Sequence, residues 1–203
     1  MQRWDELIRE LKTYPKSHEN FNEYCEGLLS VFVNAAFGTK LSLPNLTECI
    51  NTRFLSNPKL YSSEIINRCL LVLTRLKHVS LEEYSTIFRL INRNLNSLKE
   101  YKEPKVMEQL IRLLNLLYSP LEVHENGGTR KVVMVEPLPQ PLFALLKANI
   151  GSLDSGEIIF CNSCNLFCVI IDAASVDPAA EANKGFVLKN IRDNMKFLIE
   201  VAK

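Results

Sequence analysis

The stretch SLEEYSTIFRLINRNLNSL, residues 80–98, decides the fold class of this chain. Ser80 and Glu83 have the spacing of a capping box, in which each side chain bonds the backbone N–H group of the other residue and starts a helix. Behind them, apolar residues return every three or four positions, which is the period of one helix face. These apolar positions are Tyr84, Ile87, Phe88, Ile91, Leu95 and Leu98. The stretch therefore predicts a long amphipathic helix.

The same helical period continues on both sides of this stretch. Apolar stripes begin at Trp4, Phe21, Leu46 and Ile65 before it, and at Val106, Leu142, Ile158 and Val187 after it. Together they make about nine helices with short connections, so we predict an all-α fold.

Residues 121–140 interrupt the helical period. Glu125-Asn126-Gly127-Gly128, where asparagine and glycine tolerate positive φ angles, is flanked by Leu121-Glu122-Val123 and by Lys131-Val132-Val133-Met134-Val135. This pattern predicts either a β-hairpin or a long exposed loop, and a disordered insertion is an open alternative. Loops of this length often bind something, and a strand or an apolar anchor can add to a partner. The candidate partner-binding residues in this segment are Val132, Met134 and Leu138.

The composition is that of a folded chain of nearly neutral charge. Of its 203 residues, 47% are hydrophobic and 23% are charged. The charged residues are 24 lysines and arginines and 23 aspartates and glutamates. These values exclude a disordered or fibrous chain and give no overall attraction to nucleic acid or membrane. The N-terminal residues do not resemble a signal peptide, and no apolar run reaches the roughly 18 residues of a membrane span. We expect an intracellular protein, cytoplasmic or nuclear, without membrane contact.

The expected helices begin every ~20 residues, and helix pairs repeat every ~40 residues, which is the spacing of helical solenoids. In this rhythm the chain resembles the armadillo/HEAT-like helical repeat superfamily. The resemblance implies stacked helices with an extended groove, and a compact helical bundle is the alternative. We expect a single helical domain over residues 1–203, with helical halves 1–118 and 141–203 on either side of the segment 119–140.

The resemblance implies a non-enzymatic scaffold or adaptor that binds protein partners within a larger complex. Armadillo-like grooves use asparagines to hydrogen-bond the backbone of a bound peptide. Asn92 and Asn96 are four residues apart on one predicted helix face and are candidates for this role, although an asparagine-rich composition also explains them.

A nucleic-acid-associated adaptor is a second hypothesis, and it rests on charge. Residues 61–118 carry nine basic and six acidic side chains. Within them Arg89 and Arg93 share a helix face and form part of a basic strip that suits phosphates or an acidic protein partner. An ordinary solvated helix face accounts for the same residues.

A third hypothesis is a small zinc-dependent module at Cys161, Cys164 and Cys168. If residues 158–174 form one helix, Cys161 and Cys168 are ~10 Å apart along its axis, too far for one zinc ion to bind both. A zinc site would need strands here and a fourth ligand such as His124. Packing of the thiols in a helical core is the alternative. Since no motif pairs a nucleophile with a base, we expect no enzymatic activity, metal or cofactor.

Overall fold

The computed structural model describes residues 2–36, 43–76, 81–119, 121–125, 128–132, 140–150 and 156–176. These residues are mainly helical, which confirms the predicted all-α class. The chain forms two compact units, residues 1–113 and 114–203, and the boundary falls within helix α6.

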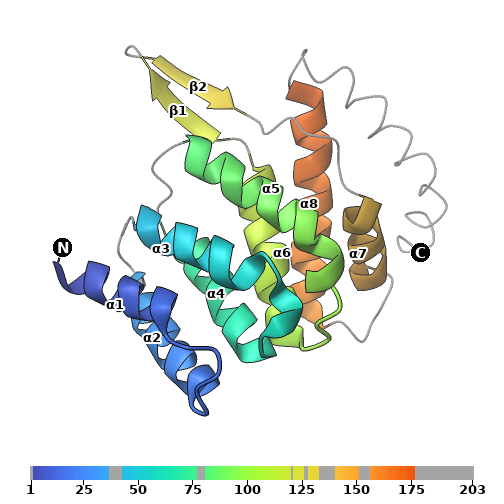
Figure 1. The fold of residues 1–203 in the computed structure, drawn as a ribbon. Helices are drawn as coiled ribbons and strands as arrows, with labels where there is room; N and C mark the ends of the chain where they lie inside the picture. The colour runs from blue at the N-terminus through green and yellow to red at the C-terminus, as the bar shows by residue number, and fades with distance from the viewer. Residues whose placement is uncertain are drawn as a thin grey trace. The chain divides into compact units, whose positions relative to one another are not determined.

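Helices follow one another through the first unit (Figure 1). The helices α1 to α6 begin 18 to 23 residues apart. Two short helical segments, η1 and η2, lie between α3 and α4. The bounds are Gln2–Thr13 for α1, Phe21–Ala36 for α2, Pro44–Cys49 for α3, Ile50–Leu55 for η1, Pro58–Leu60 for η2, Ser63–Arg75 for α4, Leu81–Leu98 for α5 and Pro104–Tyr118 for α6.

The helices of this unit pack against their next-but-one neighbours. Helix α1 contacts α3, and α5 contacts η1, which continues α3. Helix α2 contacts α4, and Lys105 at the start of α6 forms an ion pair with Glu64 of α4. These contacts follow two rows, one through α1, α3 with η1, and α5, and the other through α2, α4 and α6, and the rows also contact each other, α1 with α2 and α4 with η1.

The apolar stripe of α5 is buried as the sequence predicts. All six of its apolar positions, from Tyr84 to Leu98, lie in the core. Three cysteines from other helices, Cys25, Cys49 and Cys69, are buried as well. Burial raises the pKa of the Cys49 thiol to about 11, and it raises the pKa of Cys25 and Cys69 too. These thiols act as small apolar core residues.

The helix that begins as α3 widens into a π-helix at η1. Apart from Cys49, its buried residues repeat every four positions, in the rows Leu46, Ile50, Phe54 and Thr47, Asn51, Leu55. Over eight residues, an α-helix with 3.6 residues per turn would rotate such a row by about 80°. Wider π turns reduce this rotation, which keeps both rows directed into the core.

Arg53 of η1 holds the end of α1 in place. Its guanidinium group donates hydrogen bonds to the carbonyl oxygens of Lys12 and Tyr14, at the end of α1 where carbonyls lack helical partners. Its own carbonyl accepts a hydrogen bond of 2.5 Å from the hydroxyl of Tyr61. The guanidinium carbon also lies 5.4 Å from the centre of the Phe21 ring. One side chain thus joins α1, η1 and the start of α2.

The second unit contains the end of α6, two strands and two further helices in its described residues. Strands β1 (Leu121–Glu125) and β2 (Gly128–Val132) pair antiparallel, with Leu121 opposite Val132. Helix α7 (Gln140–Ile150) packs against α8 (Glu157–Val176). Gly156 has a φ of 80° directly before α8, a conformation that glycine adopts without strain.

Asn115 connects α6 to α8 through both ends of its side-chain amide. Its Nδ2 donates to the carbonyl oxygen of Asn162 at 2.9 Å, and its Oδ1 accepts from Nδ2 of Asn165 at 2.8 Å. The asparagine therefore fixes which turn of α8 lies beside the end of α6.

The buried face of α8 differs from the one that the sequence suggests. By their spacing, Phe160, Cys164, Phe167, Cys168 and Ile171 share one helical face, and the cysteine packing hypothesis places this face in the core. The structure instead buries Ile159, Ser163, Leu166 and Ile170, while Cys161 and Cys168 are exposed and Cys164 is half-buried. The prediction was wrong because apolar residues lie on nearly every side of this helix, so the period alone selects no face.

Candidate partner-binding surface

Three of the predicted binding residues lie together on the outer side of α5. Arg89, Arg93 and Asn96 are exposed and follow one another at spacings of four and three residues, which places them on one side of the helix. We call these three residues the α5 face. Asn92 is half-buried beside them.

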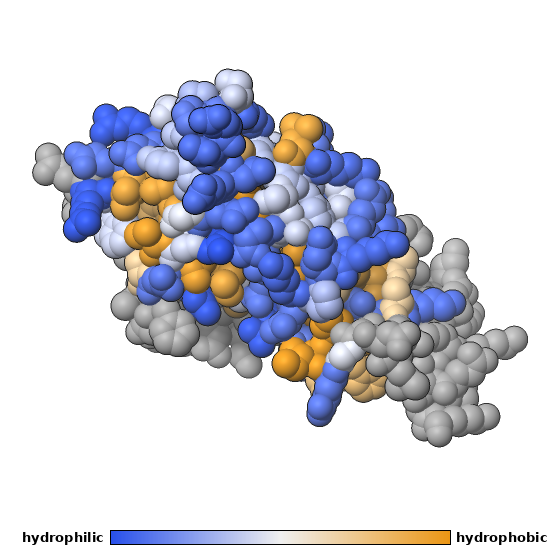
Figure 2. Space-filling view, turned by 90° about the horizontal axis from the view of Figure 1, so that it is seen from below, coloured by the Kyte–Doolittle hydropathy of each residue, from blue (hydrophilic) through white to orange (hydrophobic). Residues whose placement is uncertain are grey.

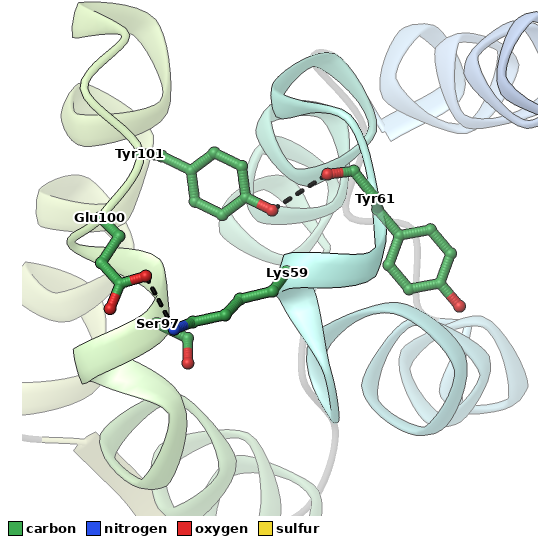
Figure 3. Close-up of a pocket in the computed structure, with 5 residues that line it drawn as sticks. All are labelled: Lys59, Tyr61, Ser97, Glu100 and Tyr101. Atoms are coloured by element: carbon green, nitrogen blue, oxygen red, sulfur yellow. Dashed lines mark hydrogen bonds and ion pairs between the residues drawn. The ribbon is translucent and has the colours of Figure 1, made fainter.

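The α5 face leads to a pocket at the end of the helix. This pocket has a volume of about 330 Å³ and is lined by Lys59, Tyr61, Ser97, Glu100 and Tyr101 (Figure 3). Ser97 and Glu100 follow Arg93 and Asn96 by four residues each, the spacing of neighbours on a helix surface. The α5 face and the pocket therefore form one continuous surface of the first unit.

Two contacts join the pocket walls. The Tyr101 hydroxyl lies 2.6 Å from the carbonyl oxygen of Pro58 and 3.1 Å from that of Tyr61, and its single proton can serve either acceptor. Partial burial raises the pKa of this hydroxyl, so it stays a donor at neutral pH. Figure 3 shows the Tyr101 ring reaching toward the Tyr61 carbonyl, while the Tyr61 ring points away from it. These bonds hold η2 against the end of α5.

The charged pair of the pocket is weak enough to exchange partners. Lys59 Nζ lies 2.8 Å from Glu100 Oε2, and the two side chains are 54% and 57% exposed. An ion pair at this exposure contributes roughly 1 kcal/mol or less. A charged group of a partner can therefore replace either member at small cost.

Leucine side chains at both ends of α5 are exposed to solvent. Leu81 at the start of the helix is 45% exposed, and Leu60 of η2 is 64% exposed beside the pocket residues Lys59 and Tyr61. On the face of the molecule in Figure 2, hydrophobic residues form small patches among hydrophilic ones. Leu60 and Leu81 thus offer apolar contacts near a surface that is otherwise polar.

Several cations within residues 61–118 are paired with glutamates. Glu64 Oε1 lies 2.9 Å from Arg68 Nη2, and its other oxygen binds Lys105. The hydrogen bond from Lys105, helped by the charge of Arg68, lowers the pKa of Glu64. Arg112 likewise lies 2.8 Å from Glu108. This pairing reduces the positive potential that the composition of residues 61–118 suggests.

The hairpin candidates are placed only in part. Val132 is the last residue of β2, in the second unit. Met134 and Leu138 lie outside the described residues.

The cysteine segment forms a helix, whereas the zinc hypothesis requires strands there. Cys161, Cys164 and Cys168 all lie within the continuous helix α8, so one zinc ion cannot bind all three thiols. In the described ranges, no three His, Cys, Asp or Glu side chains gather in a way that could hold a metal ion.

The pocket itself was not predicted from the sequence. Lys59, Tyr61 and Tyr101 come from a three-residue helix and two loops, where no periodic pattern exists. The available signal was Tyr101 in a polar segment directly after the α5 stripe, since a tyrosine there is well suited to bond a distant backbone.

Within the described part of the chain, no helix combines the length and the apolar character that crossing a membrane requires. Comparisons with protein families, with curated proteins and with solved structures give no match to this chain. The function must therefore be inferred from the surface itself.

Proposed function

We propose that this chain is a non-enzymatic helical scaffold that binds a protein partner through the α5 face and the adjoining pocket. The observation that carries the proposal is the alignment of Arg89, Arg93 and Asn96 with Ser97 and Glu100. Exposed cationic and amide groups run along one helix and end at a hollow large enough for a side chain, which suits a partner segment lying along the helix.

The packing of the first unit supports a repeat-like stack of helices. In solenoid proteins, each helix packs against the equivalent helix of the next repeat, and the contacts form parallel rows. The contacts of α1 with α3 and of α2 with α4 follow this pattern. We therefore propose an armadillo/HEAT-like arrangement, in which α5 continues the row of α1 and α3.

The chemistry of the surface favours an acidic partner segment. Two arginines one turn apart can each form charge-assisted hydrogen bonds with carboxylates, and Arg does so with two parallel bonds. Exposed Leu60 adds an apolar contact next to the pocket. We propose a segment with acidic residues along α5 and an apolar residue at the pocket.

Charge reversal on α5 tests this proposal. The double variant Arg89→Glu and Arg93→Glu is compared with the native chain in quantitative co-purification from cells that express the chain natively. We expect at least one protein to be retained by the native chain and lost from the variant. The carboxylates of this partner would be repelled by the two introduced glutamates.

The matched control is the double variant Arg3→Glu and Arg9→Glu on α1. Both arginines are exposed, and the net charge changes by the same amount. A partner of the α5 face stays bound to this control. The proposal fails if both double variants lose the same proteins or if neither loses any. It also fails if the retained species is nucleic acid, whose binding weakens steeply with salt.

A further inference from the structure

A second hollow lies on the first unit, away from the residues of the α5 face. It has a volume of about 500 Å³ and lies along α2, next to the loop that joins α1 to α2. The loop contributes Tyr14 and Asn20, and α2 contributes the rest of the lining, which is Glu23, Tyr24, Gly27 and Leu28. We call this the α2 hollow.

Gly27 is the residue that opens the α2 hollow. It lies in the interior of α2 and is exposed. A Cβ atom added at this position would meet no atom within 4 Å, and its φ angle lies outside the range that favours glycine. Neither packing nor backbone geometry requires glycine here, although glycine destabilises a helix interior relative to alanine. What the missing side chain provides is space between Tyr24 and Leu28.

Two tyrosine rings form the aromatic wall of the α2 hollow. The rings of Tyr14 and Tyr24 stack with their centres 4.0 Å apart and their planes at 17°. The Tyr24 hydroxyl donates to Glu10 Oε2 at 2.7 Å, and the Tyr14 hydroxyl lies 3.0 Å from His18 Nδ1. These two bonds fix the rings in place, so the wall is formed before any ligand arrives.

The charge near the α2 hollow is negative. Glu23 lines the hollow and is exposed. Residues 14–28, which span the lining of the hollow, contain three glutamates and one lysine, Lys16, whose Nζ lies 4.6 Å from the centre of the Tyr61 ring. The cation Arg53 is already bonded to the carbonyls of Lys12 and Tyr14. Aromatic rings beside a carboxylate attract a cation, through the ring quadrupole and through ion pairing.

We propose that the α2 hollow binds a lysine or arginine side chain of a basic peptide segment. The cationic group lies against the tyrosine wall and pairs with Glu23, and the aliphatic stem passes over Gly27 onto Leu28. This site is separate from the α5 face, so it stands or falls independently of the proposed function.

The test is an NMR titration of the ¹⁵N-labelled full chain with N-acetyl-lysine methylamide and with N-acetyl-arginine methylamide. We expect saturable shifts of the amide signals of Asn20, Tyr24 and Gly27. N-acetyl-norleucine methylamide, which has a similar stem without the charge, produces no saturable shift at the same concentrations.

Two leucine variants separate the hollow from the rest of α2. Gly27→Leu places a side chain in the hollow, where its Cβ meets no atom within 4 Å, and weakens the binding of both cations at least tenfold. Asn22→Leu places the same side chain at an exposed position on another side of α2 and leaves binding unchanged. Glu23→Gln weakens binding while the tyrosine wall stays intact. A dispersed amide spectrum for each variant shows that it is folded.

The proposal is overturned if neither cation gives saturable shifts, or if Gly27→Leu binds as the native chain does. It is also overturned if norleucine binds as well as lysine, since the hollow then recognises apolar chains. The variant with Arg89→Glu and Arg93→Glu binds the two cationic amides as tightly as the native chain does. A failure of this proposal is therefore distinguishable from a failure of the proposed function.

Discussion

At the scale of single residues, Arg53 is the side chain on which the arrangement of α1 depends most. Its guanidinium group bonds two carbonyls near the end of α1 and lies near two aromatic rings. Hydrogen bonds from charged groups contribute about 1.5–3 kcal/mol each. We predict that Arg53→Met lowers the free energy of unfolding by about 2–3 kcal/mol, measured by urea denaturation.

The control for this prediction is Arg9→Met, at an exposed position of α1. Substitutions at exposed positions away from caps and networks change stability by about 0.5 kcal/mol or less. If Arg53→Met costs no more than Arg9→Met, the two carbonyls are satisfied by water, and Arg53 does not hold α1.

Glu64 makes stability depend on pH in a known direction. Its pKa lies below its ordinary value of 4.5, mainly because Lys105 donates a hydrogen bond to it. A lowered pKa in the fold means that the charged carboxylate stabilises the protein at neutral pH. This stabilisation is lost as the pH falls through the lowered pKa.

We therefore predict that Glu64→Gln lowers the free energy of unfolding at pH 7 by about 1 kcal/mol or less, as partly exposed ion pairs do. Below pH 4.5 the difference between the native chain and the variant shrinks. Urea denaturation at pH 7 and at several values below 4.5 measures it. A difference that stays constant over this range would contradict the assigned role of the carboxylate.

At the scale of elements, the thiols on α8 are more accessible to solvent than the thiols on the helices of the first unit. Cys161 and Cys168 are exposed on α8, Cys164 is half-buried, and three others are buried in the first unit. Burial slows thiol reactions because the reactive form is the thiolate, which the core disfavours.

We predict that Ellman's reagent titrates two thiols rapidly in the native protein and Cys164 more slowly. Cys25, Cys49 and Cys69 react only after unfolding, which brings the total to six. The double variant Cys161→Ser and Cys168→Ser removes the rapid phase. Rapid reaction of more than three thiols in the native chain would show that the core opens readily.

The elements also show what the sequence can and cannot predict. The buried face of α5 was predicted correctly. Polar residues occupy the opposite side of this helix, so the spacing of its apolar residues identifies a single buried face. For α8 the helix was predicted but its buried face was wrong, since apolar residues surround it. The π turns at Ile50–Leu55 were not predicted, because the spacings of the apolar residues Leu46, Cys49, Ile50 and Phe54 also fit an ordinary α-helix.

The candidate site divides in the same way. Arg89 and Arg93 were identified from the spacing within one helix, which is a local property. The pocket depends on Tyr101 reaching Pro58, 43 residues earlier in the chain, and no local pattern records such a contact. The helical part of the surface is therefore predictable from the sequence, and the part made by contacts between distant segments is not.

At the scale of the whole molecule, the near balance of charge governs solubility. The net charge is +1, and the sequence isoelectric point is about 7.6. Proteins associate most readily where the net charge is near zero. We predict a solubility minimum near pH 7.6 in a precipitation assay.

The two double charge reversals extend this prediction. Each replaces two arginines by two glutamates, which changes the net charge from +1 to −3 at pH 7. The solubility minimum therefore moves to lower pH, by the same amount for both variants. If the pH of the solubility minimum shifts by different amounts in the two variants, one of the arginine pairs mediates association between molecules.

The wide turns of η1 affect how this chain aligns with related sequences. A π turn holds more residues than an α turn, so a relative with one residue fewer between Cys49 and Ser56 would have an ordinary α-helix here. Residues after the deletion would keep their directions around the helix axis, because the wide turn is what accommodates the extra residue. The wide turns of η1 therefore let the helix hold an extra residue without turning Phe54 and Leu55 out of the core.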